Sequence, residues 1–546
     1  MKNKKYPSAS VFLSAMLFFF FAGTQSAQSA EYYFDLAAFN SLGSQINLSQ
    51  SLSYTDSETG QTRYFWFSDA AMTNPLDSLP DFSNPENSYI FTSDEGYSAG
   101  RIIIDTEFNA ARIYSADVNK NVYFQAASSD TKINIGTVDH GNAYDMGFKG
   151  RDTSATVENV SANGNGIFYF GNVENPIKSF EVTGTFYAKG HGANGYWVTM
   201  YAGGVENHGI DNPDGKINIL TANISAADPV SRNMLTYGLS SSWFPTRANI
   251  NETSYVRINS ITGQAGLWVG GATTSTGKLT VILAATDTFS ETIGNIWEGY
   301  YSYTEGEHVY SYKDGGAQLA LVMRSSVELE GGGYQYLNNT QSFTGEQIFF
   351  TGGVQMISGT LLINYKAANS GEGKTHGNLV LSKAAGAQAA AFGNNSSTVG
   401  GTFVFTNLEV TDGGGTIRVR LDYNDEADGL ICDTLAFTGS ATGSGTVLID
   451  LSAIGGNPDD YIAFMIANDV ELKIISWESA ADANITFAAT DGYKVYNYNG
   501  EDYLFTAKNL SDGLYVSYVV VPEPAEWAAI LGLAAIALVV LRRRRK

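Results

Sequence analysis

The sequence predicts an all-β protein, and three observations favour this fold class. Glycine accounts for 58 of 546 residues, proline for only 11, and aromatic residues make up 13% of the chain. Short runs of β-branched and aromatic residues recur, bounded by Gly, Asn, Asp or Ser, which readily adopt turn conformations. No long amphipathic helix stands out between residues 31 and 521. Such a pattern is typical of sandwiches, barrels and solenoids.

The N-terminal segment, residues 1–30, has the pattern of a secretory signal peptide. Three lysines among the first five residues precede an apolar run from Val11 to Gly23, and small residues follow up to Ala30. A basic start, an apolar core and a small-residue exit direct export across a membrane. We therefore expect cleavage between Ala27 and Glu31 and export across the inner membrane.

Residues 31–325 are predicted to be a β-rich ectodomain, with a solenoid as the preferred arrangement. Nine runs have strand composition: 101–105, 121–125, 132–136, 166–171, 180–187, 216–220, 255–261, 278–284 and 318–323. Beyond them, the alanine-rich piece at 384–392 is interpreted as a loop or a single helical turn.

The second half of the chain resembles a known repeat. It contains a polar turn at residues 338–340, a Thr344-Gly345 corner and a strand beginning Gly359-Thr360-Leu361. This order resembles the autotransporter-associated β-strand repeat. The runs at 428–435, 437–439, 445–450 and 461–467 look like the closing turns of a pertactin-type passenger domain.

That resemblance implies a right-handed parallel β-helix over residues 326–520, in which each turn passes its backbone hydrogen bonds to the next. An autotransporter also carries a transmembrane β-barrel, whose strands alternate apolar and polar residues. The end of this chain has a short apolar stretch and an arginine run instead. Only the passenger-like fold is therefore expected to carry over.

The C-terminal segment, residues 521–546, combines a Pro-Glu-Pro sequence, an uncharged apolar stretch at 528–541 and a basic tail. This order resembles the PEP-CTERM sorting signal, which exosortases recognise. The resemblance implies sorting-signal roles for Pro522, Glu523, Pro524, Arg542, Arg543, Arg544 and Arg545. It also implies an exosortase as the processing partner and a destination at the cell surface or in the extracellular matrix.

Simple geometry indicates how this segment meets the inner membrane. Residues 527–541 rise about 22 Å as a helix, which is short for a hydrocarbon core of about 30 Å. The basic tail suits the cytoplasmic side. We expect a single transmembrane helix that holds the precursor transiently, because its length makes it a marginal anchor.

The net charge and the cysteine content exclude two classes of protein, those that bind nucleic acids and those stabilised by internal disulfides. Without residues 1–30 and 525–546, 24 basic side chains face 54 acidic ones, a net charge of −30. Such a surface repels phosphate backbones, so no nucleic-acid partner is expected. Cys432 is the only cysteine, so no disulfide forms within the chain.

Several short patterns match the letters of catalytic or binding motifs without their context. Residues 96–100, GYSAG, precede a strand-like run instead of a helix, and Gly373-Lys374-Thr375 lacks the glycine that a phosphate loop needs five residues earlier. We therefore expect no catalytic role for the first and a surface turn at the second. The five histidines have no metal-ligand spacing and are interpreted as turn or surface residues: His140, His191, His208, His308 and His376.

The acidic turn at 422–429 permits Ca²⁺ binding, as does a weaker turn at 211–215, but solvated turns are the preferred interpretation. Five tryptophans, interpreted mainly as core residues, would stack on sugars if exposed: Trp66, Trp197, Trp243, Trp268 and Trp297. The sequence thus predicts no catalytic residue, no metal ligand and no cofactor, with Ca²⁺ as the alternative.

These observations favour an exported structural or adhesin-like protein of the cell surface or matrix, associated with extracellular polysaccharide. A carbohydrate-active enzyme on the same scaffold, a polysaccharide lyase or glycosidase, is the first alternative and would require carboxylates gathered on one face. A glycan-binding protein without catalysis is the second. It would tolerate the loss of every acid.

Overall fold

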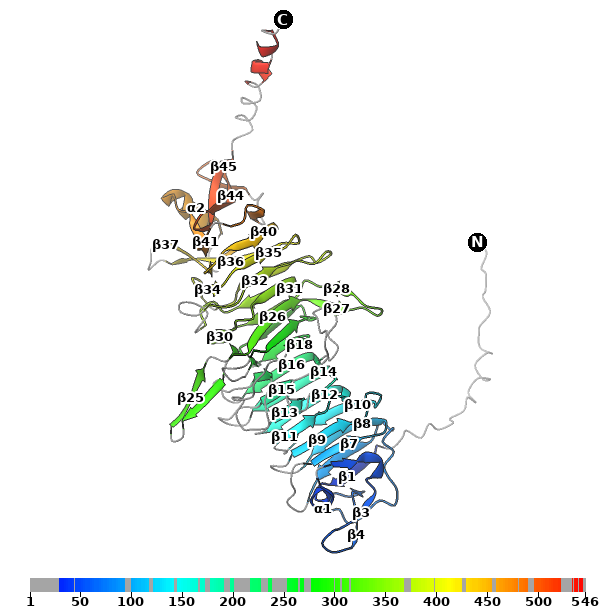
Figure 1. The fold of residues 1–546 in the computed structure, drawn as a ribbon. Helices are drawn as coiled ribbons and strands as arrows, with labels where there is room; N and C mark the ends of the chain where they lie inside the picture. The colour runs from blue at the N-terminus through cyan, green and yellow to red at the C-terminus, as the bar shows by residue number, and fades with distance from the viewer. Residues whose placement is uncertain are drawn as a thin grey trace, which may run out of the picture.

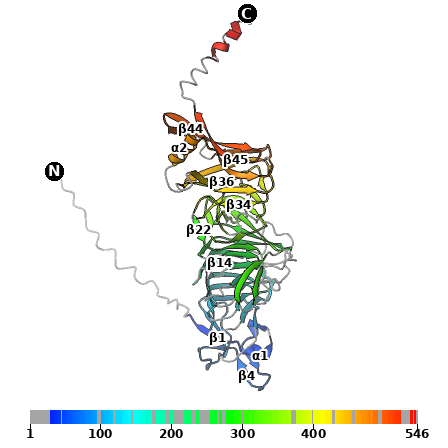
Figure 2. The same ribbon diagram turned by 90° about the vertical axis from the view of Figure 1, so that its left-hand side faces the viewer.

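The computed structural model shows an elongated stack of strands, with β1 near one end and β45 near the other (Figures 1 and 2). It describes residues 29–521 except 44, 94–99, 117–120, 142–144, 165–166, 172–176, 191–196, 201–216, 227–233, 238–252, 264–265, 270–275, 299, 305–306, 314–315, 368–374, 397, 425–428, 454–457, 480 and 490–494, together with 533, 535–538 and 540–543. Strands dominate the described chain, which confirms the predicted all-β class.

Among the described residues, a large sheet holds 23 strands. Its first eleven strands are β1 (Glu31–Asp35), β5 (Trp66–Phe67), β6 (Ser88–Thr92), β8 (Phe108–Ser115), β10 (Ile133–Asp139), β12 (Ser154–Gly164), β14 (Ser179–Gly190), β16 (Ile217–Ala226), β18 (Thr253–Ile258), β19 (Ile261–Gly263) and β21 (Lys278–Leu283). The other twelve are β22 (Phe289–Thr292), β26 (Gln318–Arg324), β29 (Thr340–Phe343), β31 (Val354–Ile363), β32 (Leu379–Leu381), β33 (Ala390–Asn394), β35 (Leu408–Val410), β36 (Gly415–Asn424), β37 (Gly429–Cys432), β39 (Ala441–Gly443), β40 (Gly445–Ala453) and β42 (Ile485–Ala489).

A second sheet holds ten of the described strands: β2 (Gln45–Asn47), β7 (Gly100–Ile104), β9 (Asn121–Ala126), β11 (Asp145–Phe148), β13 (Ile167–Phe170), β15 (Trp197–Met200), β17 (Met234–Tyr237), β20 (Gly266–Val269), β23 (Ile296–Glu298) and β30 (Ile348–Phe349). A terminal sheet contains β34 (Thr402–Phe405), β38 (Thr434–Phe437), β41 (Leu472–Trp477), β43 (Val495–Tyr498), β44 (Glu501–Leu510) and β45 (Gly513–Val521).

The remaining elements lie outside these sheets. They are three hairpins, β3 (Ser53–Thr55) with β4 (Thr62–Tyr64), β24 (Tyr300–Thr304) with β25 (Glu307–Lys313), and β27 (Ser326–Glu328) with β28 (Tyr334–Tyr336), and the short helices α1 (Ala38–Leu42), η1 (Leu48–Gln50) and α2 (Pro458–Asn468). Figure 1 shows the β24–β25 and β27–β28 hairpins projecting from the stack.

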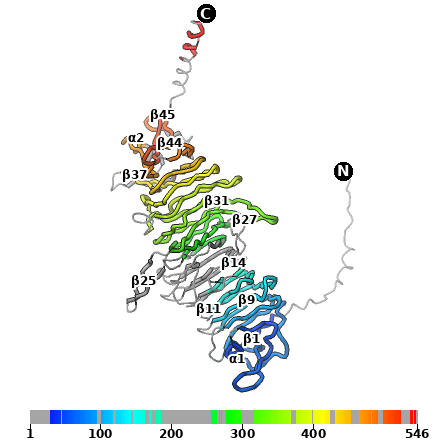
Figure 3. The backbone as a smooth tube through the Cα atoms, viewed as in Figure 1, coloured from blue at the N-terminus to red at the C-terminus, as the bar shows by residue number. Residues whose placement is uncertain are grey.

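The chain alternates between the large sheet and the second sheet as it advances. β8, β10, β12 and β14 pair in parallel in the large sheet, while β7, β9, β11 and β13 pair in parallel in the second sheet. We call one strand in each sheet, with its connections, one pass. Successive passes therefore lie side by side along the stack, as the tube in Figure 3 shows.

The core runs along the stack because inward residues fall in register from one pass to the next. Ile46, Ile102, Phe124 and Phe148 occupy one row of the second sheet, and each is at most 5% exposed. Side chains alternate between the two faces of a strand, so every second residue enters this core. Removing such side chains from water stabilises the fold by roughly 1.5 to 3 kcal/mol each.

Gly359 shows why one residue of the Gly-Thr-Leu motif must be glycine. Its φ is +79°, and a Cβ there would lie 2.5 Å from Ser325 Cβ and 2.7 Å from the Asn339 oxygen. Only glycine combines that backbone conformation with so close an approach. The motif thus marks a tight contact between neighbouring passes.

All nine runs predicted as strands in the first half coincide with observed strands, from β7 to β26. In the second half, residues 461–467 were expected to belong to a closing turn of the β-helix, but they lie in α2. Pro458 begins this helix and two aspartates follow in its first turn, which suits a helix N-terminus. The alanine-rich piece at 384–392 is a loop that ends in β33, so its last residues were also misassigned.

The parallel arrangement expected through residue 520 stops earlier. β34, β38 and β41 pair in parallel, but β45 pairs with β41 in the antiparallel direction, as do β44 with β45 and β43 with β44. Conversely, parallel pairing already begins with β1 and β6. It therefore covers most of the predicted 31–325 region as well.

The predicted membrane segment is only partly described. Residues 533, 535–538 and 540–543 are helical, and Leu533 and Leu538 are 67% and 68% exposed. Within the described residues, no helix has the length and apolar character needed to span a membrane.

Candidate functional site

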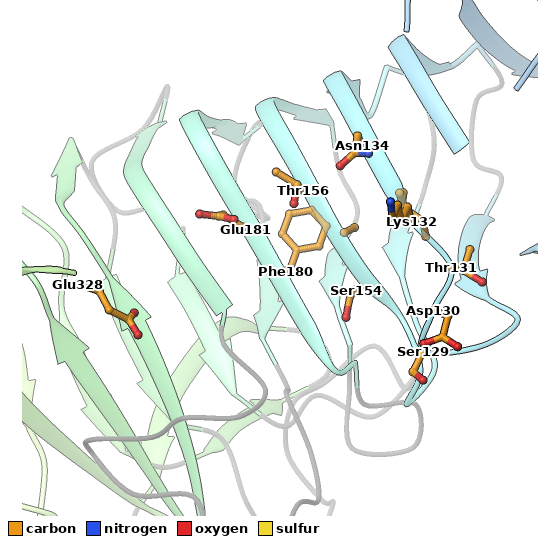
Figure 4. A pocket seen from close by; sticks show the side chains of 12 residues that line it. Ser129, Asp130, Thr131, Lys132, Asn134, Ser154, Thr156, Phe180, Glu181 and Glu328 are labelled. Atoms are coloured by element: carbon orange, nitrogen blue, oxygen red, sulfur yellow. The ribbon is translucent and has the colours of Figure 1, made fainter. Parts of the chain in front are cut away.

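A groove of about 570 Å³ lies on the outer face of the large sheet, near its N-terminal end. Figure 4 shows the side chains that line it, contributed by the loop before β10, by β10, β12 and β14, and by the β27–β28 hairpin. Its lining residues are Ser129, Asp130, Thr131, Lys132, Ile133, Asn134, Ser154, Ala155, Thr156, Phe180, Glu181 and Glu328.

The floor of the groove is a row of polar residues held in register. Asn134 pairs with Asn109 of β8 on one side and with Thr156 on the other, and Thr156 pairs with Glu181. Their neighbours in sequence, such as Ile135, Val157 and Val182, are buried in the core. Successive side chains point to opposite faces of a strand. Since the apolar neighbours face the core, the polar row faces the outside of the sheet.

Hydrogen bonds fix the amides at the edge of this groove. Asn134 Nδ2 donates to Asn109 Oδ1 at 2.9 Å, and Asn109 Nδ2 donates to the Ser83 carbonyl oxygen at 2.9 Å and to Glu107 Oε1 at 3.2 Å. The asparagines therefore form a ladder across neighbouring passes, which preorganises the polar row.

The chemistry of the groove is hydrogen bonding. Lys132, Asn134, Glu181 and Glu328 are exposed, so charges of both signs and an amide face solvent together. Phe180 lines the groove, but its side chain is fully buried. Among the described residues the groove thus has no exposed aromatic floor, and its contacts suit a hydroxyl-rich ligand.

A second groove of about 470 Å³ lies further along the same face, where β18, β21, β26 and β31 run side by side. Its polar lining includes Lys278, Thr280, Gln318, Gln355 and Asn378. Polar grooves therefore recur along the outer face of the large sheet instead of being confined to one point.

Glu298, at the end of β23, is the most unusual buried acid described. It is 2% exposed, and its Oε1 accepts hydrogen bonds from the backbone N–H groups of Leu319 and Thr351, each at 2.5 Å. Oε2 accepts from Thr351 Oγ1 at 2.8 Å. These bonds favour the carboxylate, but burial outweighs them and raises the pKa of Glu298 to about 7. Glu298 clamps neighbouring passes together.

The prediction that the histidines lie in turns or at the surface is wrong for His140 and His376, which are fully buried. His376 stacks on Phe403 with ring centroids 4.0 Å apart. Its ring nitrogens lie 2.8 Å from the Val404 oxygen and 3.2 Å from the Ile348 oxygen. Burial lowers the pKa of His376 to about 4, so its ring is a neutral core group at pH 7.

The candidate metal sites are only partly described. Asp422 and Asn424 lie at the end of β36, whereas residues 425–428 of that acidic turn, and all of 211–215, lie outside the described residues. Within the described part of the chain, no group of three or more His, Cys, Asp or Glu side chains is placed to hold a metal ion.

Most of the predicted sorting signal also lies outside the described residues, namely Pro522, Glu523, Pro524, Arg544 and Arg545. Arg542 and Arg543 are described and continue the short C-terminal helix. Residues 96–99, Gly373 and Lys374 are not described either.

Of the tryptophans considered for sugar stacking, Trp66 and Trp297 are buried, as core residues should be. The side chains of Trp197, Trp243 and Trp268 are not among those described.

Sequence reasoning missed the groove because its residues come from different passes. Asn109, Asn134, Thr156 and Glu181 are polar positions within strands, and each lies 22 to 25 residues after the one before. That spacing was the available signal, since one pass has this length here. A scan of the sequence against protein-family models finds no match, and a search among curated proteins also finds none.

Proposed function

We propose that this chain is an exported structural or adhesin-like protein of the cell surface or extracellular matrix, built on a right-handed parallel β-helix. The observation that carries the proposal is the parallel, in-register pairing of successive passes, which runs from β1 and β6 to β40 and β42. A stack of this kind is long and stiff, and it displays grooves along its side without needing one enclosed pocket.

The proposed route to the surface depends on the two ends of the sequence. Residues 1–30 direct export, and the 521–546 segment holds the precursor in the inner membrane until an exosortase acts near Pro522-Glu523-Pro524. Proline fixes φ and disfavours helix at the residue before it, so two prolines here suit a segment that a processing enzyme must reach. The basic tail from Arg542 to Arg545 remains on the cytoplasmic side.

Mass spectrometry of the protein from fractionated cells tests this route. We expect a mature chain that starts between Ala27 and Glu31, ends near Pro524 and is found in the outer-surface or matrix fraction. A P522A/P524A double variant should accumulate in the inner membrane with its C terminus intact. A full-length chain in the cytosol, or unchanged sorting of the double variant, would contradict the proposal.

The polar groove favours a second, compatible role, the binding of extracellular polysaccharide without catalysis. Its supporting observation is the outward row of Asn134, Thr156 and Glu181, whose amide, hydroxyl and carboxylate groups match the hydroxyls of a sugar chain. Because such a groove binds through several hydrogen bonds, each single loss should weaken binding only about tenfold.

Binding assays with neutral polysaccharides test this role. N134A should weaken retention. E181Q should weaken it too, because Glu181 lines the groove, which differs from the acid-independent binding expected from the sequence. E158Q should not, since Glu158 is an exposed residue of β12 outside the groove lining. Release of sugar fragments by the wild-type protein would favour the lyase or glycosidase alternative. Equal binding by all three variants would show that polysaccharide does not bind in this groove.

A further inference from the structure

Two buried arginines lie on the same outer face as the groove. The row that contains Thr156 and Glu181 continues through position 218 of β16 to Arg257 of β18. Arg257 is only 4% exposed and Arg324, at the end of β26, is 1% exposed. Burial of two like charges on an outward face requires a physical explanation, since arginine normally keeps its guanidinium in water.

The β27–β28 hairpin contacts both guanidinium groups. Arg257 Nη2 donates a hydrogen bond of 2.7 Å to the Ser326 carbonyl oxygen. The Tyr334 ring lies over both arginines, with its centroid 4.0 Å from Arg324 Cζ and 5.8 Å from Arg257 Cζ. The hairpin therefore covers the pair with a carbonyl and an aromatic face, and the Glu328 carboxylate of the same hairpin acts on the charge of Arg257.

One nitrogen of Arg257 is left without an acceptor. Nη1 is buried and has no hydrogen-bond partner among the described residues. Burial, and then the neighbouring Arg324 guanidinium, lower the pKa of Arg257. A buried donor without an acceptor is costly, and a nearby like charge adds to the cost. Such a group in a native protein calls for an explanation, and a bound ion that satisfies the donor is one.

We propose that Arg257 and Arg324 form a binding site for one oxyanion group, a carboxylate, sulfate or phosphate, beneath the β27–β28 hairpin. A guanidinium fork matches the two oxygens of such a group. The ligand carries few charges, because the strongly acidic surface repels polyanions. This site is independent of the export route proposed above.

The hairpin provides the way in. Glu328, its last β27 residue, lines the groove described above and lies close enough to Arg257 to act on its charge. The tip contains Gly331, Gly332 and Gly333, all with positive φ and with open space around them. A tip of this kind bends without steric penalty. A ligand in the groove therefore approaches the arginines past Glu328 and this hairpin.

Equilibrium dialysis of the full-length protein in mild detergent tests the proposal directly. Labelled sulfate, phosphate and glucuronate are used as separate probes, in chloride buffer of constant ionic strength. We expect saturable binding of about one equivalent of at least one probe, and the probe that binds identifies the class of oxyanion. Absence of saturable binding for all three would overturn the proposal.

Variants then locate the binding. R257M should abolish it and R257K should weaken it about tenfold, because lysine lacks the planar fork. R418M is the matched control, since Arg418 pairs with Asp450 at 3.1 Å elsewhere on the large sheet and is partly exposed. Equal binding by R257M and R418M would overturn the assignment, and the wild-type dialysis remains decisive if R257M does not fold.

Thermal unfolding supplies a second readout. Without oxyanion, R257M should unfold at a higher temperature than the wild type, because replacing a poorly paired buried charge with an apolar group is stabilising. If Arg257 served only to anchor the hairpin, R257M would unfold at a lower temperature and sulfate would stabilise both proteins equally.

Discussion

The two ends of the stack cover the same kind of apolar core by different means. At the N-terminal end, Trp66 is fully buried, with its ring centroid 4.9 Å from that of Phe34 and 5.6 Å from that of Tyr89. At the C-terminal end, the chain reverses direction in β44 and β45, and Leu514 and Val516 complete the core.

The two ends show two ways of shielding the apolar core of a stack of strands from water. An aromatic plug concentrates the closing contacts in a few large rings, and Trp66 Nε1 still finds a partner in Ser51 Oγ at 2.9 Å. An antiparallel cap spreads its contacts over a hairpin and keeps ion pairs outside, such as Lys508 with Glu471 at 2.9 Å. Single substitutions should therefore damage the first end more than the second.

Trp66→Ala should have the largest effect. Truncation of a buried tryptophan leaves a cavity and typically costs about 3 to 5 kcal/mol. Because passes contact mainly their neighbours, the damage should stay local. Hydrogen exchange should accelerate over residues 31–115 and stay unchanged over 472–521. Equal acceleration at both ends would show that the stack unfolds as one unit.

Glu298 tests whether the middle of the stack behaves differently from both ends. Its folded pKa of about 7 exceeds the ordinary value of 4.5, so its contribution to stability is present at low pH and is lost as pH rises from about 4.5 to about 7. A shift of this size corresponds to roughly 3 kcal/mol. In E298Q, the free energy of unfolding should therefore fall less than in the wild type as the pH rises through this range.

Denaturant titrations of wild type and E298Q at pH 5 and pH 8 measure this difference. The glutamine oxygen still accepts from the Leu319 and Thr351 N–H groups, and its amide donates to Thr351 Oγ1, so the clamp persists. His376 is present in both proteins, and its opposite trend, stability lost as pH falls from 6.5 to about 4, cancels in the comparison. Parallel pH profiles would refute the role of Glu298.

Leu514→Ala should cost about 2 to 3 kcal/mol, in the lower part of the range for buried leucine, because a terminal hairpin relaxes into the space left behind. Hydrogen exchange should accelerate over residues 472–521 and not at the N-terminal end. A larger loss than that of Trp66→Ala would reverse the proposed ranking of the two ends.

Lys508→Met should have the smallest effect. Lys508 and Glu471 are about half and one-third exposed, and such surface pairs contribute at most about 1 kcal/mol. The difference between the melting temperatures of variant and wild type should shrink further in 1 M salt. A salt-independent loss of several degrees would indicate that the outer ion pairs, and not the apolar contacts, hold the cap.

The sequence predicts where strands occur along the chain better than it predicts which residues contact each other in the fold. The run at 278–284 is recognisable as β21 from its own composition, because β propensity and turn residues act locally. α2 escaped detection because its apolar residues show no clear helical period, although Pro458 and the following aspartates mark its start.

The environment of His376 depends on distant residues, which explains why its surroundings were mispredicted. Its immediate neighbours are glycine, threonine and asparagine, but Phe350 and Phe403 approach it from other parts of the chain. The same holds for Arg257 and for the groove, which exist only once the register between passes is known. Residue spacing suggests that register, and pairing of the strands fixes it.

Because successive passes pair in register, the length of the molecule depends on how many passes it contains. Neighbouring strands lie about 4.8 Å apart, so the deletion or duplication of one whole pass would change its reach by about that amount and leave its cross-section unchanged. Gene-level gain or loss of passes is therefore an available way to tune how far such a rod extends, without any redesign of the interior.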